Sequence, residues 1–126
     1  MDILKSAVGY CRYSSDHQKE LSIEAQQRAI ETYADKNGYS IKEWYIDRAF
    51  SGQTDNRPDF QRLIKDIEEG NGDFKAVIVH KLDRFSRSVV DSFQYKQFFC
   101  DMGIELISTE ENISGDEFIF GINALL

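Results

Sequence analysis

Apolar positions in the first third of the chain alternate between strand-like and helix-like spacing. Residues 7–13 (AVGYCRY) predict a first strand. Ser22 is placed to cap a helix that runs to about Asn37, with Gly38 just beyond its end. Residues 40–46 then predict a second strand. A strand, a helix and another strand in this order indicate an α/β layer architecture.

The same alternation continues to the end of the domain. Pro58 favours a helix start, and four apolar residues then follow at i, i+3, i+4 and i+7: Phe60, Leu63, Ile64 and Ile67. Residues 74–80 predict a strand buried on both faces. A helix over 88–102 and a strand over 104–108 complete the pattern, while the polar stretch 47–57 predicts a loop. We therefore expect a central, mostly parallel sheet flanked by helices.

Composition is that of one ordinary globular domain. The chain has 126 residues, of which 41% are hydrophobic and 29% charged. No apolar run approaches the roughly 18 residues of a membrane span, and residues 1–5 lack the apolar region of a signal peptide. We expect a cytoplasmic protein with no membrane partner.

Net charge and the few cysteines and histidines argue against two kinds of site, a broad DNA-binding surface and a zinc site. A net charge of −7 argues against DNA binding by the surface as a whole, so any nucleic-acid contact must be local or depend on another domain. Cys11 and Cys100 lie far apart in the sequence, and both are expected to be reduced, semi-buried thiols. His17 and His80 have no second ligand nearby, so no zinc site is expected.

The first candidate for chemistry lies at the end of the first predicted strand. Residues two apart on a strand point the same way, so Tyr10, Arg12 and Ser14 share one face. Ligands of α/β sheets gather at the carboxyl ends of parallel strands. A hydroxyl and a guanidinium are therefore expected together where substrates bind, although an ordinary surface serine near an arginine would give the same pattern.

The second candidate is the segment 81–87 (KLDRFSR), which directly follows the predicted central strand. Several cations in so short a segment favour an anionic ligand. If Arg87 begins the next helix, the helix dipole adds to this preference. The segment contains Lys81, Asp83, Arg84 and Arg87.

Arg57 closes the third candidate segment, 50–57. The three segments together supply one serine hydroxyl and four arginines. Arginine binds phosphate oxygens in a bidentate fork, and such groups stabilise a phosphoryl transition state without a metal ion. The chemistry indicated is transesterification at phosphorus through a covalent phosphoseryl intermediate. The general base is unassigned. Asp83 either donates a proton to the leaving oxygen or orients Arg84 or Arg87.

These segments, in this order, resemble the resolvase/invertase family of serine site-specific recombinases. The resemblance rests on residues 10–15 (YCRYSS) with Gln18 close behind, on residues 51–57 (SGQTDNR) and on residues 81–87. It implies a resolvase-like three-layer α/β fold. It also implies a homodimer that assembles into a tetramer on two double-stranded DNA sites, with no cofactor, metal or ATP.

The resemblance also implies a role for each matching residue. Ser14 is the nucleophile and forms a transient 5′-phosphoseryl linkage before strand exchange and religation. Four arginines bind the phosphate: Arg12, Arg57, Arg84 and Arg87. Asp83 matches the acidic position, and the supporting polar residues are Tyr10, Gln18, Ser51 and Lys81. Ser15, often threonine in the family, is an alternative nucleophile that the same-face argument disfavours.

Two further segments, residues 19–21 and the stretch from Gly115 onward, bear on the subfamily and on domain organisation. The stretch 19–21 before Ser22 is similar to the large serine recombinases rather than the small resolvases. From Gly115 onward apolar residues recur at helical spacing and the chain then stops. We expect residues 1–126 to form one catalytic domain, truncated at the start of the long interface helix and lacking the DNA-binding region.

Two other functions remain as alternatives. A metal-dependent phosphoesterase or nuclease would need carboxylates clustered at a strand end, and Asp47, Asp55 and Asp83 are isolated in the sequence. A non-enzymatic α/β interaction module would form no covalent adduct with DNA. Loss of activity in Ser14→Ala, with no effect of EDTA, separates the recombinase from the first alternative.

Overall fold

The computed structural model describes residues 3–13, 21–48, 57–70, 72–85 and 89–111. In chain order the elements are β1 (Lys5–Tyr13), α1 (Ile23–Asn37), β2 (Tyr39–Arg48), α2 (Pro58–Glu68), β3 (Ala76–Val79), α3 (Leu82–Phe85), α4 (Val89–Asp101) and β4 (Glu105–Ser108).

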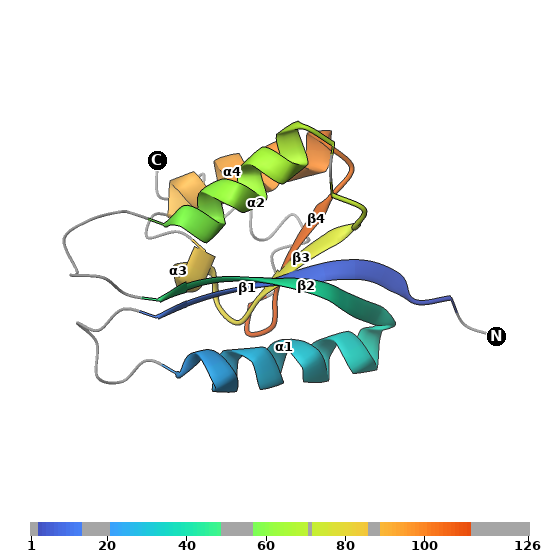
Figure 1. Cartoon of the computed structure of the whole chain (residues 1–126), viewed down its shortest axis with the longest axis vertical. Helices are drawn as coiled ribbons and strands as arrows, with labels where there is room; N and C mark the ends of the chain where they lie inside the picture. Colours follow the sequence, from blue (N-terminus) through green and yellow to red (C-terminus); the bar gives the residue numbers. More distant parts are fainter. Residues whose placement is uncertain (1–2, 14–20, 49–56, 71, 86–88, 112–126) are drawn as a thin grey trace.

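The four strands form one parallel sheet in the order β2-β1-β3-β4. In Figure 1, α1 covers one face of the sheet, and α2 and α4 cover the other. The layers are helix, sheet and helix, so the expected three-layer α/β architecture with a parallel sheet is confirmed.

Each face of the sheet has its own apolar core, and β1 contributes to both. Val8 and Tyr10 pack on the side of α2 and α4, whereas Ala7 and Cys11 pack on the side of α1. The alternation follows from the pleat of the strand. β3 (Ala76–Val79) is fully buried on both faces, as the apolar run 74–80 predicts.

α1 shows how short-range signals set an element's ends. The Ser22 side chain accepts a hydrogen bond from the Ala25 amide at 3.1 Å and caps the amino end. Gly38 adopts the left-handed conformation (φ 78°) and its amide bonds the Ala34 carbonyl. A side chain at this φ would be strained, so glycine suits the helix stop.

The structure differs from the sequence expectations, or adds to them, at three points. The short helix α3 was not predicted, because four residues are too few to show periodicity. Asp47 and Arg48 belong to β2 rather than to a loop, and Asp47 is buried. Cys11 is fully buried but Cys100 is exposed, although both thiols are free as expected. The helix expected from Gly115 lies outside the described residues.

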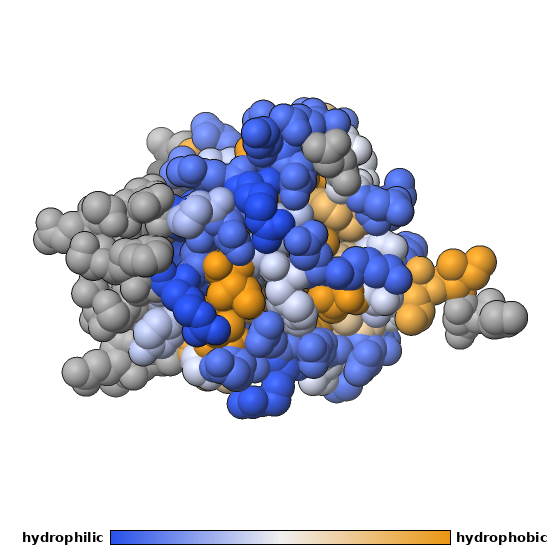
Figure 2. Space-filling view, viewed as in Figure 1, coloured by the Kyte–Doolittle hydropathy of each residue, from blue (hydrophilic) through white to orange (hydrophobic). Residues whose placement is uncertain are grey.

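The described surface is mostly polar. Figure 2 shows hydrophilic residues over most of the face in view, with apolar atoms at one end and in smaller patches nearer the centre. Ile3 and Leu4, just before β1, are among the exposed large hydrophobic residues. No helix in the described part of the chain is long and apolar enough to cross a membrane.

Candidate active site

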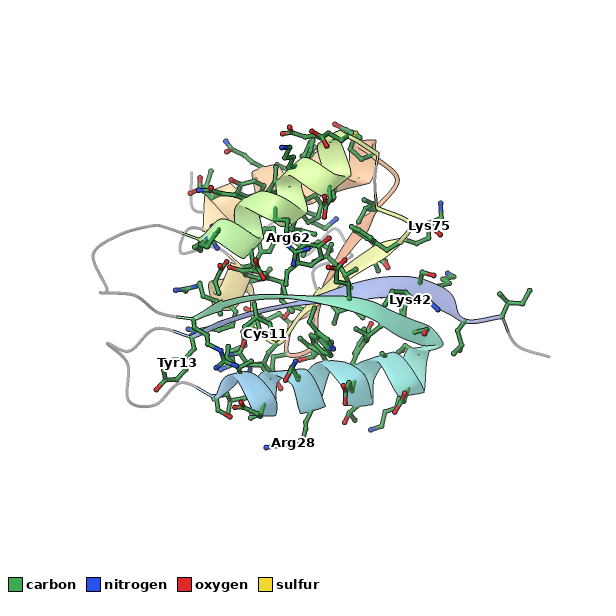
Figure 3. All side chains as sticks on the ribbon, in the orientation of Figure 1. Cys11, Tyr13, Arg28, Lys42, Arg62 and Lys75 are labelled. Atoms are coloured by element: carbon green, nitrogen blue, oxygen red, sulfur yellow. The ribbon has the colours of Figure 1, made fainter. Side chains whose placement is uncertain are left out.

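The candidate site lies at the carboxyl end of β1, beside α3. Tyr10 is buried in the core under α2 and α4, while Cys11 and Tyr13 lie on the α1 side of the sheet (Figure 3). The Arg12 side chain reaches α3, on the same side as Tyr10. The predicted division of these side chains between the two faces is therefore confirmed for the described residues.

Arg12 and Arg57 both bond the last carbonyl groups of α3. The Nε of Arg12 donates to the carbonyl oxygen of Arg84 at 3.2 Å, and an NH group of Arg57 donates to the carbonyl oxygen of Phe85. Carbonyls at the end of a helix have no partner within that helix, so the two guanidinium groups supply the missing donors. Arg12, Arg57 and Arg84, from three separate segments, thus gather around one short helix.

Aromatic packing fixes the position of Arg57. Its guanidinium carbon lies 3.8 Å from the centroid of the Phe60 ring. Phe60 in turn makes edge contacts with Tyr10 and Phe85, at centroid separations of 5.6 and 5.1 Å. Cation–π contact stabilises a guanidinium over an aromatic face. Arg57, predicted to end a loop, is the residue that immediately precedes α2, and it is half-buried.

Asp47 joins β1 to the start of α2. Its carboxylate accepts hydrogen bonds from the Tyr10 hydroxyl at 2.8 Å and from the Asp59 and Phe60 amides, each at 2.9 Å. A negative charge at a helix amino end is favourable. Since Arg57 is the residue before α2, this capping interaction also sets where Arg57 lies.

The Tyr10 phenol stays neutral and donates to Asp47. Burial raises the pKa of Tyr10 far above its ordinary value; the positive charge of Arg57 opposes the shift and the charge of Asp47 adds to it. Tyr10 is therefore a fixed link between the strand that carries Arg12 and the helix that follows Arg57.

Gln26 holds the end of β1 from the other side of the sheet. Its side-chain oxygen accepts from the Arg12 amide at 3.2 Å, and its nitrogen donates to the Arg12 carbonyl at 2.9 Å and to the Leu21 carbonyl at 3.0 Å. The residue is fully buried. Both backbone groups of Arg12 are thus held by one side chain, two residues before Ser14.

The structure locates five of the ten predicted site residues, and the roles of all ten stay predictions. Tyr10, Arg12, Arg57 and Arg84 lie together, as described above. Lys81 is exposed immediately before α3, and its carbonyl accepts from the Arg84 amide at 3.0 Å. The remaining predictions fall outside the described residues or side chains: Ser14, Gln18, Ser51, Asp83 and Arg87.

Comparison with a known family settles the relationship. Residues 7–125 match the family model described as "Resolvase, N terminal domain". The chain belongs to the resolvase family. It is 28% identical over 123 residues to the Tn917 resolvase of Enterococcus faecalis, a match that covers 94% of this chain and 59% of that protein. The chain thus spans less than two thirds of this resolvase's length.

Two solved structures share the fold of this chain. The N-terminal catalytic domain of TP901-1 integrase superposes with a TM-score of 0.75 at 36% identity, covering 96% of this chain and 91% of that one. A resolvase family site-specific recombinase from Streptococcus pneumoniae superposes with a TM-score of 0.80 at 30% identity, covering 96% and 85%. Both identities accompany nearly complete coverage, so the resolvase-like fold is shared across the whole domain.

Two residues that support the candidate site, Gln26 and Asp47, were not predicted. Each shows the same signal in the sequence: a polar residue at an apolar position. Gln26 stands in the buried stripe of α1 with Ile23 and Ile30, and Asp47 follows the buried Tyr45 by two residues on β2. A polar residue on a buried face must find partners, and here the partners are groups of the site.

Metal-ligating side chains do not gather in the described part of the domain. No group of three or more histidine, cysteine, aspartate or glutamate residues there is placed to hold a metal ion. The buried Asp47 is occupied by one hydroxyl and two amide donors.

Proposed function

We propose that this chain is the catalytic domain of a serine site-specific recombinase that cuts and rejoins DNA through Ser14. The observation that carries the proposal is the meeting of Arg12 and Arg57 at the carbonyl end of α3, the helix that contains Arg84. Ser14 follows directly on β1, two residues after Arg12. Membership of the resolvase family supports the same assignment.

In the proposed reaction the Ser14 oxygen attacks a DNA phosphodiester. A bond forms between that oxygen and phosphorus, the bond from phosphorus to the 3′ oxygen breaks, and the 3′ end leaves as a hydroxyl. The phosphoseryl ester keeps the energy of the broken bond, so reversal of the step on a new 3′ hydroxyl rejoins the strand without ATP. No residue is assigned as the base that accepts the serine proton. Asp83 either protonates the leaving oxygen or orients an arginine.

The arginines stabilise the charge that develops on the transferring phosphoryl group. Arg12 and Arg57 are held in place before substrate arrives, by α3, by the Phe60 ring and by the Asp47 network. Preorganised donors of this kind are each worth about 10²–10³ in rate. Arg84 and Arg87 complete the proposed set, with Gln18, Ser51 and Lys81 as supporting residues and no metal ion required.

The domain is proposed to act within a longer protein. DNA sites would be bound mainly by a C-terminal region outside this chain, and dimers would pair into a tetramer. Net charge of −7 supports this division, because an acidic domain gains little from the phosphate backbone.

Covalent trapping tests the proposal. The full-length protein is incubated with DNA that carries a nick in a recombination site, so that the cut strand diffuses away and the adduct accumulates. We expect a protein–DNA adduct at the 5′ end that forms in EDTA and is absent in Ser14→Ala. Arg57→Lys, which keeps the charge but loses the fork, should slow adduct formation by about 10²-fold.

An adduct that survives in Ser14→Ala, or DNA cleavage that requires a divalent cation and leaves no adduct, would refute the proposal. The first outcome would point to another nucleophile and the second to a metal-dependent nuclease. Lys65→Gln, a change on the exposed face of α2, is the matched control and should form adduct at the normal rate.

A further inference from the structure

A hollow of about 420 Å³ lies at the amino ends of the strands. Lys5 and Glu105 begin β1 and β4, and Lys75 immediately precedes β3. The candidate active site lies at the opposite, carboxyl end of the sheet. Figure 3 shows the separation, with Lys75 near one end of the molecule and Tyr13 near the other.

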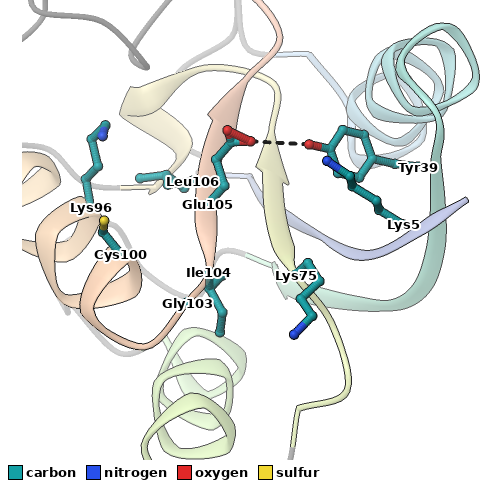
Figure 4. Close-up of a pocket in the computed structure, with 9 residues that line it drawn as sticks. All are labelled: Lys5, Tyr39, Lys75, Lys96, Cys100, Gly103, Ile104, Glu105 and Leu106. Atoms are coloured by element: carbon teal, nitrogen blue, oxygen red, sulfur yellow. Dashed lines mark hydrogen bonds between the residues drawn. The ribbon is translucent and has the colours of Figure 1, made fainter.

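Three lysines line this hollow: Lys5, Lys75 and Lys96 (Figure 4). In the described part of the chain none of their ammonium groups has a carboxylate within 4.0 Å. Acidic residues outnumber basic ones in this protein by 22 to 15. Three lysines without ion pairs around one hollow therefore form a local positive site on an acidic molecule.

The one acidic side chain in the described lining is already engaged. Glu105 accepts a hydrogen bond from the Tyr39 hydroxyl at 3.2 Å. Burial raises the pKa of Tyr39 and the negative charge of Glu105 raises it further, so the phenol remains a neutral donor. Glu105 thus pairs with a phenol rather than with a lysine.

Backbone hydrogen bonds fix the main chain of Lys5 and Lys75. The Lys5 amide donates to the Gly38 carbonyl at 2.9 Å, and the Lys75 amide donates to the Ser6 carbonyl at 2.7 Å. The Glu105 amide donates to the Lys75 carbonyl at 2.9 Å. The sheet itself therefore sets where two of the three side chains begin, and their flexible stems can turn each ammonium group toward a ligand.

We propose that this hollow binds a small multivalent oxyanion of the diphosphate class. Like charges that share a hollow repel one another, and an anion among them removes that repulsion while gaining attraction from each. The volume lies within the range of about 300–1,000 Å³ typical of small-molecule sites. A duplex, which presents its phosphates along a broad rod, would not enter it.

Cys100 supplies a reporter for the test. It lines the hollow and is exposed, whereas Cys11, the other cysteine of the chain, is fully buried. A neutral thiol reagent such as iodoacetamide should therefore label Cys100 selectively, and Cys100→Ser gives the background. We expect inorganic pyrophosphate at about 10 mM to slow labelling about fivefold, as a mostly occupied site would.

Matched variants separate specific binding from screening. In Lys5→Gln/Lys75→Gln the protection should fall below about twofold, because the site then loses two of its three positive charges. Lys42→Gln, an exposed lysine of β2 outside the hollow, should keep full protection. Equal slowing by sodium chloride at the same ionic strength, or protection that persists in the double variant, would overturn the proposal. Protection by duplex DNA but not by pyrophosphate would overturn it as well.

Discussion

At the scale of single residues, the site depends on one buried carboxylate. Asp47 accepts from Tyr10 on β1 and from two amides at the start of α2, so it connects the strand that carries Arg12 to the helix that follows Arg57. A second pair offers a comparison, since the Tyr45 hydroxyl donates to Asp66 of α2 at 2.6 Å. Asp66 lies two turns further along the helix, away from Arg57.

Asp47→Asn and Asp66→Asn should therefore differ in function. Asp47→Asn should lower the free energy of unfolding by about 1–3 kcal/mol, because three donors bond its two oxygens and asparagine keeps only one of these acceptors. Asp66→Asn should lower it by less, because the amide oxygen can still accept from the Tyr45 hydroxyl. Only Asp47→Asn should also slow phosphoseryl adduct formation, by about tenfold or more, because it releases the start of α2 and hence Arg57. Denaturant unfolding gives the first quantity and single-turnover trapping the second.

The comparison is made at a temperature where both variants are folded. Equal rates of adduct formation in the two variants would show that Asp47 contributes to stability alone and does not position Arg57.

At the scale of elements, α1 supports the site through Gln26. This side chain satisfies both backbone groups of Arg12, beyond the point where β1 pairs with β3. The Gln26 side chain thus supplies, from α1, the hydrogen bonds that a neighbouring strand would otherwise make to Arg12. The last residues of β1 before Ser14 are thus held by β2 and by α1 together.

Gln26→Leu should weaken both the fold and the reaction. Leucine fills a similar volume but leaves buried backbone groups unpaired, at a cost of about 1–3 kcal/mol for each. Adduct formation should slow as well, because the end of β1 is released. Gln27→Leu, at the partly buried neighbouring position, is the control and should change the free energy of unfolding by less than about 0.5 kcal/mol. A similar loss in the two variants would contradict the role given to Gln26.

The sequence predicts these elements wherever a local signal marks them. Ser22 and Gly38 bound α1, and Pro58 opens α2, because capping and backbone restriction act within a few residues. α3 has no such signal, because it has only four residues, and its last carbonyls are bonded by Arg12 and Arg57 from distant segments. Hydrophobic periodicity cannot predict short elements that depend on distant partners.

In the candidate site, too, local patterns predict some residues, whereas others depend on partners that are distant in the sequence. Clustering of arginines at strand ends predicts Arg12 and Arg84 near each other, because parallel strands share a carboxyl edge. The roles of Gln26 and Asp47 depend on pairing across the sheet and between layers. The sequence shows each of them as a polar residue on an apolar face, but it does not show which groups they bond.

At the scale of the whole molecule, the acidic charge supports the proposal that DNA is bound mainly outside this domain. The domain carries a net charge of −7, and the proposed phosphate site is local to three segments. Residues 1–126 alone should therefore bind duplex DNA very weakly and without sequence preference. A gel-shift titration at physiological salt checks this, and tight, site-specific binding by this chain would contradict it.

The buried thiol of Cys11 makes stability depend on pH at the alkaline end. Burial raises its pKa from 9.0 to about 12, and the charge of Arg48 opposes the shift. The folded state thus holds the proton more tightly than the unfolded chain does. This contribution is complete below pH 9 and is lost as the pH rises toward 12.

Cys11→Ala should reduce the pH dependence of the free energy of unfolding at alkaline pH. Between pH 9 and 11 the free energy of unfolding should fall less steeply than in the wild type, by up to about 1.4 kcal/mol per pH unit. Cys100→Ser, at the surface, should leave the slope unchanged. Denaturant midpoints across this range provide the measurement, and identical slopes for all three proteins would contradict the assignment.

The most direct test of the central claim is to locate the adduct within the chain. The trapped protein–DNA complex is digested with nuclease and trypsin, and the modified peptide is sequenced by mass spectrometry. Cleavage after Arg12 and Lys19 gives the peptide 13–19 (YSSDHQK), which contains both Ser14 and Ser15. We expect the nucleotide on Ser14 and unmodified Ser15. A nucleotide on Ser15, on a tyrosine or on another peptide would contradict the claim that Ser14 attacks the phosphate held by the arginines.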